Sequence, residues 1–413
     1  MSFLLGVVLF AIGITGSVAL HEAGHMWTAK AFGMRVRRYF IGFGPSIFSF
    51  RRGATEYGLK AIPAGGFCDI AGMTALDPVT PEEAPHAFFR KPTWQRVIVL
   101  SAGSMAHFMI GMLLIYALAI TTGLPVISDD PAAIPPVVGS TVCVPTKQDK
   151  ATGELTQCKP NAPSPATVAH LQPGDRIISV DGKPTNSFAE VSAEIRQHTS
   201  DEPAQLVLER AGQRLSVPVQ TVKVERLAAG AVPGRPDNRV ETVGAIGVAP
   251  KLIFSYGPLA AVPATFDYTC QSFGQVWKGL LMFPEKIPAV IRAIGGAPPD
   301  LNRPVSVVGA SIIGGDAAEQ GRWLTFVLLL AVLNFFIGVF NLLPLLPLDG
   351  GHIAVNLYQH IRDVVRERLG KTKMPPVDYT RLLPLTYAFV LVLATISLLT
   401  ITADIVNPIR LPQ

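Results

Sequence analysis

Two histidines and a glutamate near the N-terminus have the spacing of a metal site. His21, Glu22 and His25 form an HExxH sequence. On a helix, positions i and i+4 share a face, so the two imidazoles can bind one metal ion. Glu22 stands beside the first ligand, where it can take a proton from a water on that metal. HExxH also occurs by chance on exposed helices, but here it ends an uncharged apolar run from Phe3, where ionisable groups are usually functional.

The HExxH sequence needs a third ligand from elsewhere in the chain, because a catalytic zinc usually takes three protein ligands and keeps one open position. The pattern HExxHxxGxxH is excluded, since Ala31 stands six residues after His25. We expect Asp349 to be the third ligand. It follows Pro344 and Pro347 in otherwise apolar sequence, where an unpaired carboxylate is costly. The alternative is that Asp349 only caps the helix that follows it.

His107 is a second candidate ligand, in the apolar run that begins near residue 96. Small residues at 102–104 would let another helix approach closely. A buried histidine that hydrogen-bonds a neighbour is the simpler interpretation, and we favour it over a ligand.

Four segments are long and apolar enough to span a membrane as helices: residues 3–27, 96–123, 323–343 and 383–405. The 413 residues are 49% hydrophobic and 16% charged, which indicates a polytopic membrane protein with a substantial water-exposed part. No basic region or small-residue cleavage site precedes the first segment, so we expect it to be retained. The formal charge of +5 comes largely from residues flanking the spans, and it indicates topology rather than nucleic-acid binding.

Basic residues gather in the loops after the first and third segments, whereas the second segment leads into acidic residues near 129–130. The positive-inside rule therefore predicts a multi-pass protein of the inner (plasma) membrane, with both basic loops in the cytoplasm and both termini and the long central region outside. His21 lies about 27 Å along the first helix from Phe3. We expect the metal inside the membrane, near the cytoplasmic face.

Residues 33–72 alternate apolar side chains between glycines and prolines, which predicts short strands in a hairpin or small sheet. Such backbone enters a membrane only where protein or a water-filled cavity satisfies its polar groups. We interpret this region as a gate or substrate-presenting strand beside the metal, with Gly65 and Gly66 in contact with substrate. A plain cytoplasmic hairpin is the alternative.

The central region holds two cysteines and a compact soluble pattern. Cys143 and Cys158 can pair outside the cell, although two free thiols are the alternative, and Cys68 should be a free thiol in the cytoplasm. Residues 171–182 read as a Pro-Gly-Asp turn, a strand and an Asp-Gly turn, and a helix near 188–198 and two strands follow. This pattern resembles a PDZ domain, a module that binds peptides by adding a strand to a sheet edge. Residues 253–294 suit helices lying on the membrane face.

Together the motifs resemble the site-2 protease family. They are HEAGH at 21–25, IGFGP at 41–45, IPAGG at 62–66, the PDZ-like run and NLLPLLPLDGG at 341–351. The similarity is closest to the bacterial group with four spans and an extracytoplasmic PDZ domain, within it to the actinobacterial branch with one such domain. The resemblance implies a zinc intramembrane metalloprotease of peptidase family M50, with one Zn²⁺ bound by His21, His25 and Asp349 and with Glu22 as catalytic base.

The resemblance also implies which residues bind the substrate and what kind of protein the substrate is. Asn341, Pro344 and Pro347 would contact the substrate, and the substrates would be single-span membrane proteins such as anti-sigma factors, first trimmed outside by another protease. The PDZ domain would then bind a peptide or exclude untrimmed ectodomains. One departure stands out: where the family usually has AGPxxN, residues 102–107 read AGSMAH. The change touches none of the expected ligands.

The sequence thus predicts a polytopic α-helical membrane protein with four spans, a membrane-associated β-hairpin or sheet, and an α+β PDZ domain inserted between the second and third spans. The expected divisions are a first membrane part at 1–123, a PDZ domain with an N-terminal extension at 124–225, a membrane-associated connector at 226–321 and a second membrane part at 322–413. Two other functions compete. A metal transporter would need a polar pore, and a membrane-anchored PDZ scaffold would need no zinc.

Overall fold

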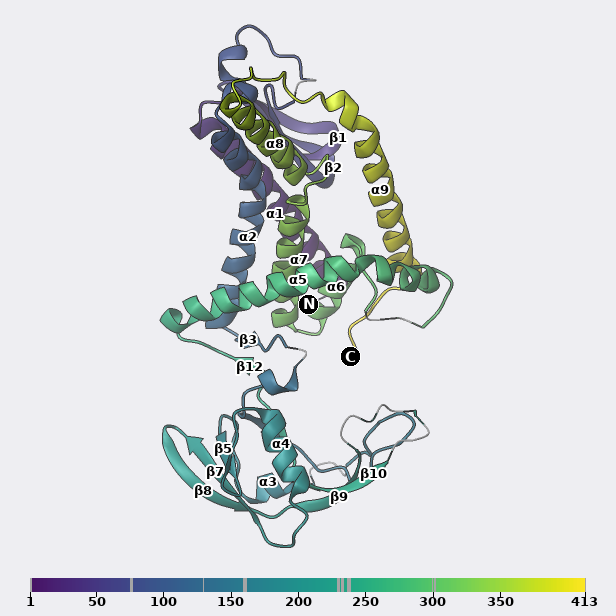
Figure 1. Cartoon of the computed structure of the whole chain (residues 1–413). Helices are drawn as coiled ribbons and strands as arrows, with labels where there is room; N and C mark the ends of the chain where they lie inside the picture. Colours follow the sequence, from purple (N-terminus) through teal and green to yellow (C-terminus); the bar gives the residue numbers. More distant parts are fainter. Residues whose placement is uncertain are drawn as a thin grey trace. The chain divides into compact units, whose positions relative to one another are not determined.

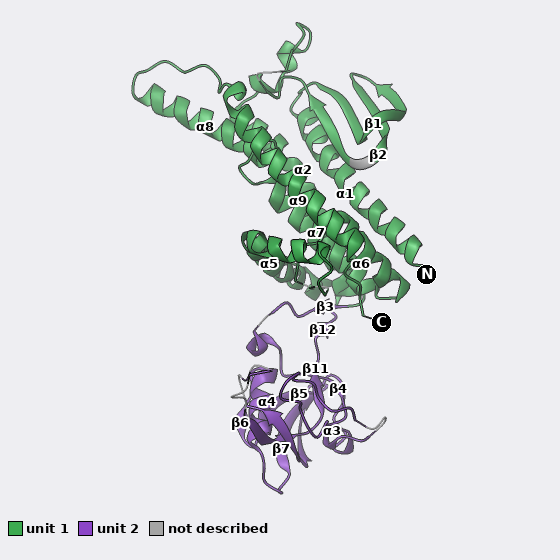
Figure 2. Cartoon of the chain, turned by 90° about the vertical axis from the view of Figure 1, so that its right-hand side faces the viewer, with its two compact units in different colours: residues 1–122, 256–413 green, residues 123–255 purple. Residues whose placement is uncertain are grey.

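The computed structural model of the protein describes residues 2–412 except 75–76, 129, 159–161, 229–230, 232–233, 236–238, 299 and 301, and except the side chains of residues 63 and 64. Two compact units make up the chain (Figure 2). One combines Met1–Thr122 with Tyr256–Gln413, and the other is Gly123–Ser255. The second unit is therefore inserted into the sequence of the first.

Four helices of the first unit are long and apolar enough to cross a membrane, which confirms the four predicted spans. They are α1 (Phe3–Ala31), α2 (Thr93–Ile120), α7 (Trp323–Asn341) and α9 (Leu383–Val406). All four run lengthwise through the unit (Figure 1), and both chain ends lie at the end of the unit opposite the β-strands. Their lipid-compatible composition makes this protein a multi-pass membrane protein.

Glycines set how closely the spanning helices pack. A β-carbon at Gly24 of α1 would stand 2.6 Å from the carbonyl oxygen of Ala102 in α2, so only glycine permits this approach. A β-carbon at Gly111 of α2 would likewise stand 2.5 Å from the ring of Phe335 in α7. Because lipid supplies no hydrophobic force between helices, such close contacts are what hold them together.

The β-region forms two long, folded strands, β1 (Val36–Arg52) and β2 (Thr55–Ile70), rather than the short strands expected. Arg38 lies opposite both Asp69 and Glu56, so the first half of β1 sits between two segments of β2. Residues 62–70 pair only with this half of β1 among the described residues, which leaves them at a sheet edge. Val36 and Ile70 pack in one core with side chains of α1 and α2, so the sheet is fixed to the spanning helices.

Two further helices of the membrane unit pack against the spanning helices. The region expected to hold several helices forms one, α5 (Pro258–Ile294), which lies across the spanning helices (Figures 1 and 2). The shorter α6 (Val307–Glu319) packs small residues against α1, as where a β-carbon at Gly6 would meet Ala318. A fully buried ion pair of 2.6 Å, Arg303 to Asp404, ties the segment before α6 to the end of α9.

The helix α8 (Asp349–Arg368) begins after the turn that ends α7 and lies at the same end of the unit as β1 and β2 (Figure 1). It packs against α2. Single-turn helices η1 (Ala84–His86), η2 (Phe88–Arg90) and η4 (Tyr379–Leu382) lie in the loops before α2 and before α9.

The second unit is an α+β domain with its own core. Its four-stranded sheet has the order β6 (Lys183–Pro184), β5 (Arg176–Val180), β7 (Ala204–Arg210), β8 (Gln213–Val219). The helix α4 (Phe188–Gln197) follows a serine cap and agrees with the helix expected near 188–198, and a turn at 211–212 joins β7 to β8. Side chains of β5, β7 and α4, among them Ile177, Leu206 and Val191, form a core with no exposed members.

Three two-stranded pairings bring residues after 225 into this second unit. They are β9 (Val222–Leu227) with β10 (Val240–Ala245), β4 (Val138–Thr141) with β11 (Val248–Pro250), and β3 (Leu124–Pro125) with β12 (Ile253–Phe254). Isolated bridges also join Val137 to Arg176 and Gln148 to Leu155. The short helices η3 (Pro131–Ala133) and α3 (Pro165–Val168) lie in the same unit. The described residues between 226 and 255 therefore belong to this second unit (Gly123–Ser255), which we call the soluble unit, whereas the sequence division assigned them to the membrane connector.

Cys143 and Cys158 form a disulfide, which is one of the two alternatives that the sequence left open, and Cys68 is a free thiol as expected. Cys270 is also free. The disulfide closes a loop within the segment that joins β4 to α3.

Candidate metal centre

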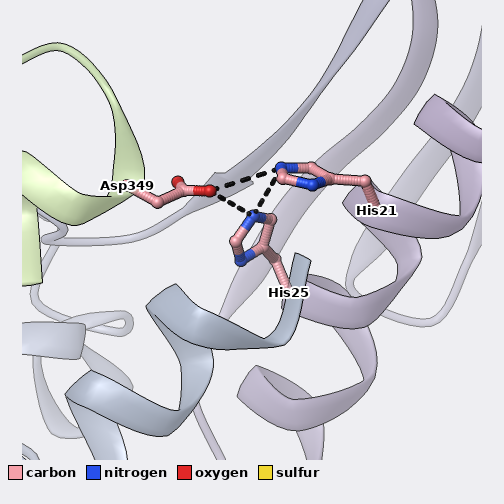
Figure 3. A group of neighbouring side chains, drawn as sticks. All are labelled: His21, His25 and Asp349. Atoms are coloured by element: carbon pink, nitrogen blue, oxygen red, sulfur yellow. Dashed lines mark hydrogen bonds and ion pairs between the residues drawn. The ribbon is translucent and has the colours of Figure 1, made fainter. Parts of the chain in front are cut away.

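Three side chains from the two ends of the chain converge in the membrane unit (Figure 3). His21 and His25 lie one turn apart on α1, and Asp349 is the first residue of α8. Asp349 Oδ2 lies 3.3 Å from His21 Nε2 and 3.4 Å from His25 Nε2, and the two nitrogens are 3.1 Å apart. Within the described part of the chain, these three form the group with ligand atoms close enough to hold a metal ion.

The donor set and its dimensions fit zinc. Ligand atoms about 2.0–2.1 Å from a tetrahedral ion lie about 3.3 Å apart, which is close to the three separations observed. Two imidazole nitrogens and one carboxylate oxygen are also ligands that zinc commonly takes at catalytic sites, leaving one position open. His21, His25 and Asp349 can therefore hold a zinc ion with little rearrangement.

A hydrogen bond from α2 fixes the orientation of His25. Its Nδ1 lies 2.7 Å from the carbonyl oxygen of Val99, and a carbonyl oxygen can only accept, so Nδ1 carries the proton. The lone pair of Nε2 is then free to face Asp349, as in metal sites where an outer acceptor orients the ligand. His21 is also buried, with 6% of its surface exposed, but its Nδ1 has no hydrogen-bond partner among the described protein atoms.

Glu22 faces a different neighbour from the two histidines. A β-carbon at Gly66 would stand 3.0 Å from Glu22 Cγ and 3.7 Å from Val18, so the edge segment of β2 runs directly past this carboxylate. The sequence expectation that a strand lies beside the metal is met at Gly66. Gly65 has φ of +103°, and a side chain there would strike the ring of Phe43.

Gly103 of α2 is a site residue that sequence reasoning noticed only as a small residue. A β-carbon there would lie 2.6 Å from His21 Nε2 and closer still to His25 Nε2. Residue 103 must therefore be glycine for α2 to close over the imidazole pair. The signal was the run of small residues at 102–104, but nothing in the sequence says which of them faces the histidines.

His107 is buried and hydrogen-bonds a neighbour, which confirms the favoured interpretation. Asn334 of α7 donates from Nδ2 to the carbonyl oxygen of Leu330, so its Oδ1 must be the acceptor for His107 Nδ1 at 2.8 Å. The His107 ring lies 5.0 Å from the His21 ring, centre to centre. Asn334 had no sequence signal that paired it with residue 107.

The expected substrate contacts lie in the segment that leads to Asp349. Asn341 ends α7, and Pro344 and Pro347 are exposed in the turn that follows. The turn folds tightly against the start of α8, where a β-carbon at Gly351 would stand 2.5 Å from the backbone nitrogen of Leu346. These residues thus belong to the segment that positions Asp349.

The soluble unit has a separate apolar cavity of about 220 Å³. Phe188, Val191 and Ile195 of α4 line one side of it, and Ile246 and Val248 line another. The strand β11 pairs with β4 alone in the described residues, so one of its edges is open.

Comparison with known proteins gives a consistent set of relatives. The profile of peptidase family M50 matches residues 9–377. Zinc metalloprotease Rip1 of Mycobacterium tuberculosis is 46% identical over 415 residues, and Rip1 of Mycolicibacterium smegmatis is 45% identical over 421 residues, each match covering 100% of both chains. The regulator of sigma-E protease RseP of Salmonella typhimurium is 26% identical, over 86% of this chain and 90% of that protein.

Proposed function

Because the chain belongs to peptidase family M50 and is a zinc metalloprotease, we propose that it hydrolyses peptide bonds inside the membrane with His21, His25 and Asp349 as zinc ligands and Glu22 as base. The observation that carries this proposal is that Asp349 of α8 meets His21 and His25 of α1, a helix that is apolar enough to span a membrane. Bound zinc supplies a Lewis acid that acidifies water and polarises a carbonyl group.

The proposed substrates are single-span membrane proteins that regulate transcription, such as anti-sigma factors. Support comes from the relative named regulator of sigma-E protease, whose chain this one matches over most of its length. Cleavage within the membrane would release the cytoplasmic part of such a substrate.

Glu22 performs the proton transfers in this proposal. Its carboxylate takes a proton from the attacking water and returns it to the amine that leaves. His25 is held by the Val99 carbonyl and keeps its Nε2 lone pair toward Asp349 throughout. Gly103 keeps α2 close over both imidazoles and so limits the space for water.

The edge segment of β2 is proposed to present the substrate. A spanning substrate is helical, so its carbonyl groups are already hydrogen-bonded and it must unwind before attack. Residues 62–70 have one unpaired edge among the described strands and pass Glu22 at Gly66. A substrate segment added to this edge would be extended beside the base. Asn341, Pro344 and Pro347 would contact it from the opposite side, ahead of Asp349.

The soluble unit is proposed to be a PDZ domain that binds a peptide. Its apolar cavity lies between α4 and residues 243–248, and an incoming strand could pair with the open edge of β11 while its side chains enter the cavity. Residues 226–255 supply that strand, so the domain is longer than the expected 124–225. A peptide seated there would come from the substrate or from a partner protein.

The proposed orientation puts both termini and the soluble unit outside the cytoplasm, in the inner membrane. It is supported by the basic residues near β1 and β2 and after α8, which lie at one end of the membrane unit, opposite the chain ends (Figure 1).

Co-expression with a single-span test substrate, tagged at both ends, tests the function. The wild type and Glu82→Ala, a change to an exposed glutamate away from the site, should release the cytoplasmic fragment. Glu22→Ala should release none while retaining one zinc per chain. Fragment release by Glu22→Ala would contradict the assigned base, and a chain without zinc would favour a scaffold.

A further inference from the structure

The far half of α8 carries an apolar face that no described part of the chain covers. The helix packs against α2 through its first turns, where Gly350, Gly351 and Asn356 are buried and Ile353 joins the core beside α1 and α2. Beyond Asn356 this packing ends. Four side chains spaced four residues apart then remain exposed, and we name them the α8 stripe: Leu357, Ile361, Val365 and Leu369.

The α8 stripe is a continuous surface rather than scattered exposure. Residues four apart lie above one another on one face of a helix. Ile361 and Leu369 expose 61% and 65% of their surfaces, and Tyr358 beside them exposes 60%. An apolar stripe of this length in water needs a partner.

The charged residues around the α8 stripe indicate which kind of partner would bind it. Residues 357–373 hold five basic and two acidic side chains. Both acidic groups already have partners, since Asp363 binds Arg362 and Glu367 binds Lys373. Arg368 and Lys371 have no carboxylate partner among the described residues. The excess cations at the end of the stripe would repel a second copy of the same surface and attract an anionic one.

Aromatic side chains indicate where the membrane surface lies. Trp27 near the end of α1 and Trp94 at the start of α2 are each more than half exposed, as is Phe89 before α2. Tryptophans in this setting mark the boundary between acyl chains and headgroups. The first turns of α8 pack beside Val99 and Leu100, one to two turns from Trp94, so α8 leaves the core at this boundary.

We propose that the far half of α8 lies in the cytoplasmic surface of the membrane and binds anionic phospholipid, with the α8 stripe among the acyl chains and Arg368 and Lys371 at the headgroups. Apolar area and basic residues act together in such helices. Because α8 starts at Asp349, this contact would also fix the direction of the helix that carries that residue.

Hydrogen exchange of the full-length protein in single-copy lipid nanodiscs tests the proposal. Amides of residues 357–369 should exchange about 30-fold more slowly in discs of phosphatidylcholine with phosphatidylglycerol than in phosphatidylcholine alone, the effect expected from two basic residues that each contribute about 1 kcal/mol at an anionic surface. Residues 350–356 should be slow in both. Equal exchange in the two discs would overturn the proposal.

Matched variants separate the contributions. Ile361→Ser/Val365→Ser should exchange fast in both discs, whereas Gln359→Ser/His360→Ser on the polar face should behave like wild type. Arg368→Gln/Lys371→Gln should remove only the difference between the lipids. Exchange in the soluble unit reports whether each variant is folded. Glu22→Ala should match wild type, so the lipid contact can fail or hold independently of proteolysis. Protection found only when discs hold two copies would assign the stripe to a second chain instead.

Discussion

Gly103 of α2 lies so close to His21 of α1 that a β-carbon at residue 103 would stand 2.6 Å from the ring nitrogen Nε2. The metal-binding atoms are therefore enclosed by backbone on one side. Because of this contact, residue 103 tolerates no side chain, so its identity is as constrained as that of the metal ligands.

Gly103→Ala should disable the site without unfolding the protein. The methyl group forces α2 or the imidazoles to shift, and displacements of about 1 Å at a catalytic site commonly cost about 100-fold in rate. Cleavage of a single-span substrate and zinc content measure the effect. Gly16→Ala on α1 is the matched control, because no atom lies within 4 Å of its added methyl group. Normal turnover by Gly103→Ala would contradict the packing described here.

The hydrogen bond between His107 and Asn334 should contribute to stability. His107→Leu leaves Asn334 Oδ1 buried without a partner, which typically costs about 1–3 kcal/mol. Unfolding in detergent, followed by tryptophan fluorescence, measures the loss. His107→Asn restores the residue usual in the family and keeps a polar group, so it should lose less. Asn334→Leu and His107→Leu/Asn334→Leu complete a double-mutant cycle, and losses that simply add would show that the two residues are not coupled.

The disulfide should stabilise the soluble unit. Cys143 and Cys158 are 15 residues apart, and closing a loop of that length contributes about 3 kcal/mol on the chain-entropy estimate. Cys143→Ser/Cys158→Ser should lower the urea midpoint of residues 123–255, a unit with its own core. Reduction of the wild type should produce the same shift, and Cys68→Ser in the full chain should produce none in this unit. Unchanged midpoints after reduction would show that the pairing adds nothing.

His198 should make the stability of the soluble unit depend on pH. The Glu202 carbonyl oxygen, and then the Asp181 carboxylate, accept hydrogen bonds from the ring and raise the pKa of His198 above its ordinary 6.5 despite some burial. The stabilising effect is therefore complete below about pH 6.5 and is lost as the pH rises through the folded-state pKa. NMR titration of residues 123–255 gives that pKa directly. Asp181→Asn should lower it, and a wild-type value below 6.5 would contradict the assignment.

Much of the membrane fold follows from local sequence. An uncharged run of about twenty residues can satisfy its backbone in lipid only as a helix, so the four spans were predictable to within a few residues. The HExxH spacing likewise put His21 and His25 on one face. Asp349 was identifiable because a carboxylate in apolar sequence needs a partner, and the structure places it beside both histidines.

Other features depend on contacts between distant segments. Nothing local distinguishes Gly103 from other small residues in α2, and Asn334 pairs with His107 only because α2 and α7 pack together. The first half of β1 pairs with two separate segments of β2. The alternation of apolar and polar residues predicts strands there, but it does not specify this arrangement. Residues 248–254 looked like part of a connector because their two strands are short and pair with partners far earlier in the chain.

The most direct test is the zinc affinity of Asp349→Ala compared with that of Asp363→Ala, a control on the same helix whose carboxylate pairs with Arg362. Competition with a chelating dye in detergent gives both values for otherwise intact chains. We predict that Asp363→Ala binds one zinc as wild type does, and that Asp349→Ala binds it more than about 100-fold more weakly, beyond the usual cost of losing an outer contact. Equal affinities for the two variants would contradict the three-residue site.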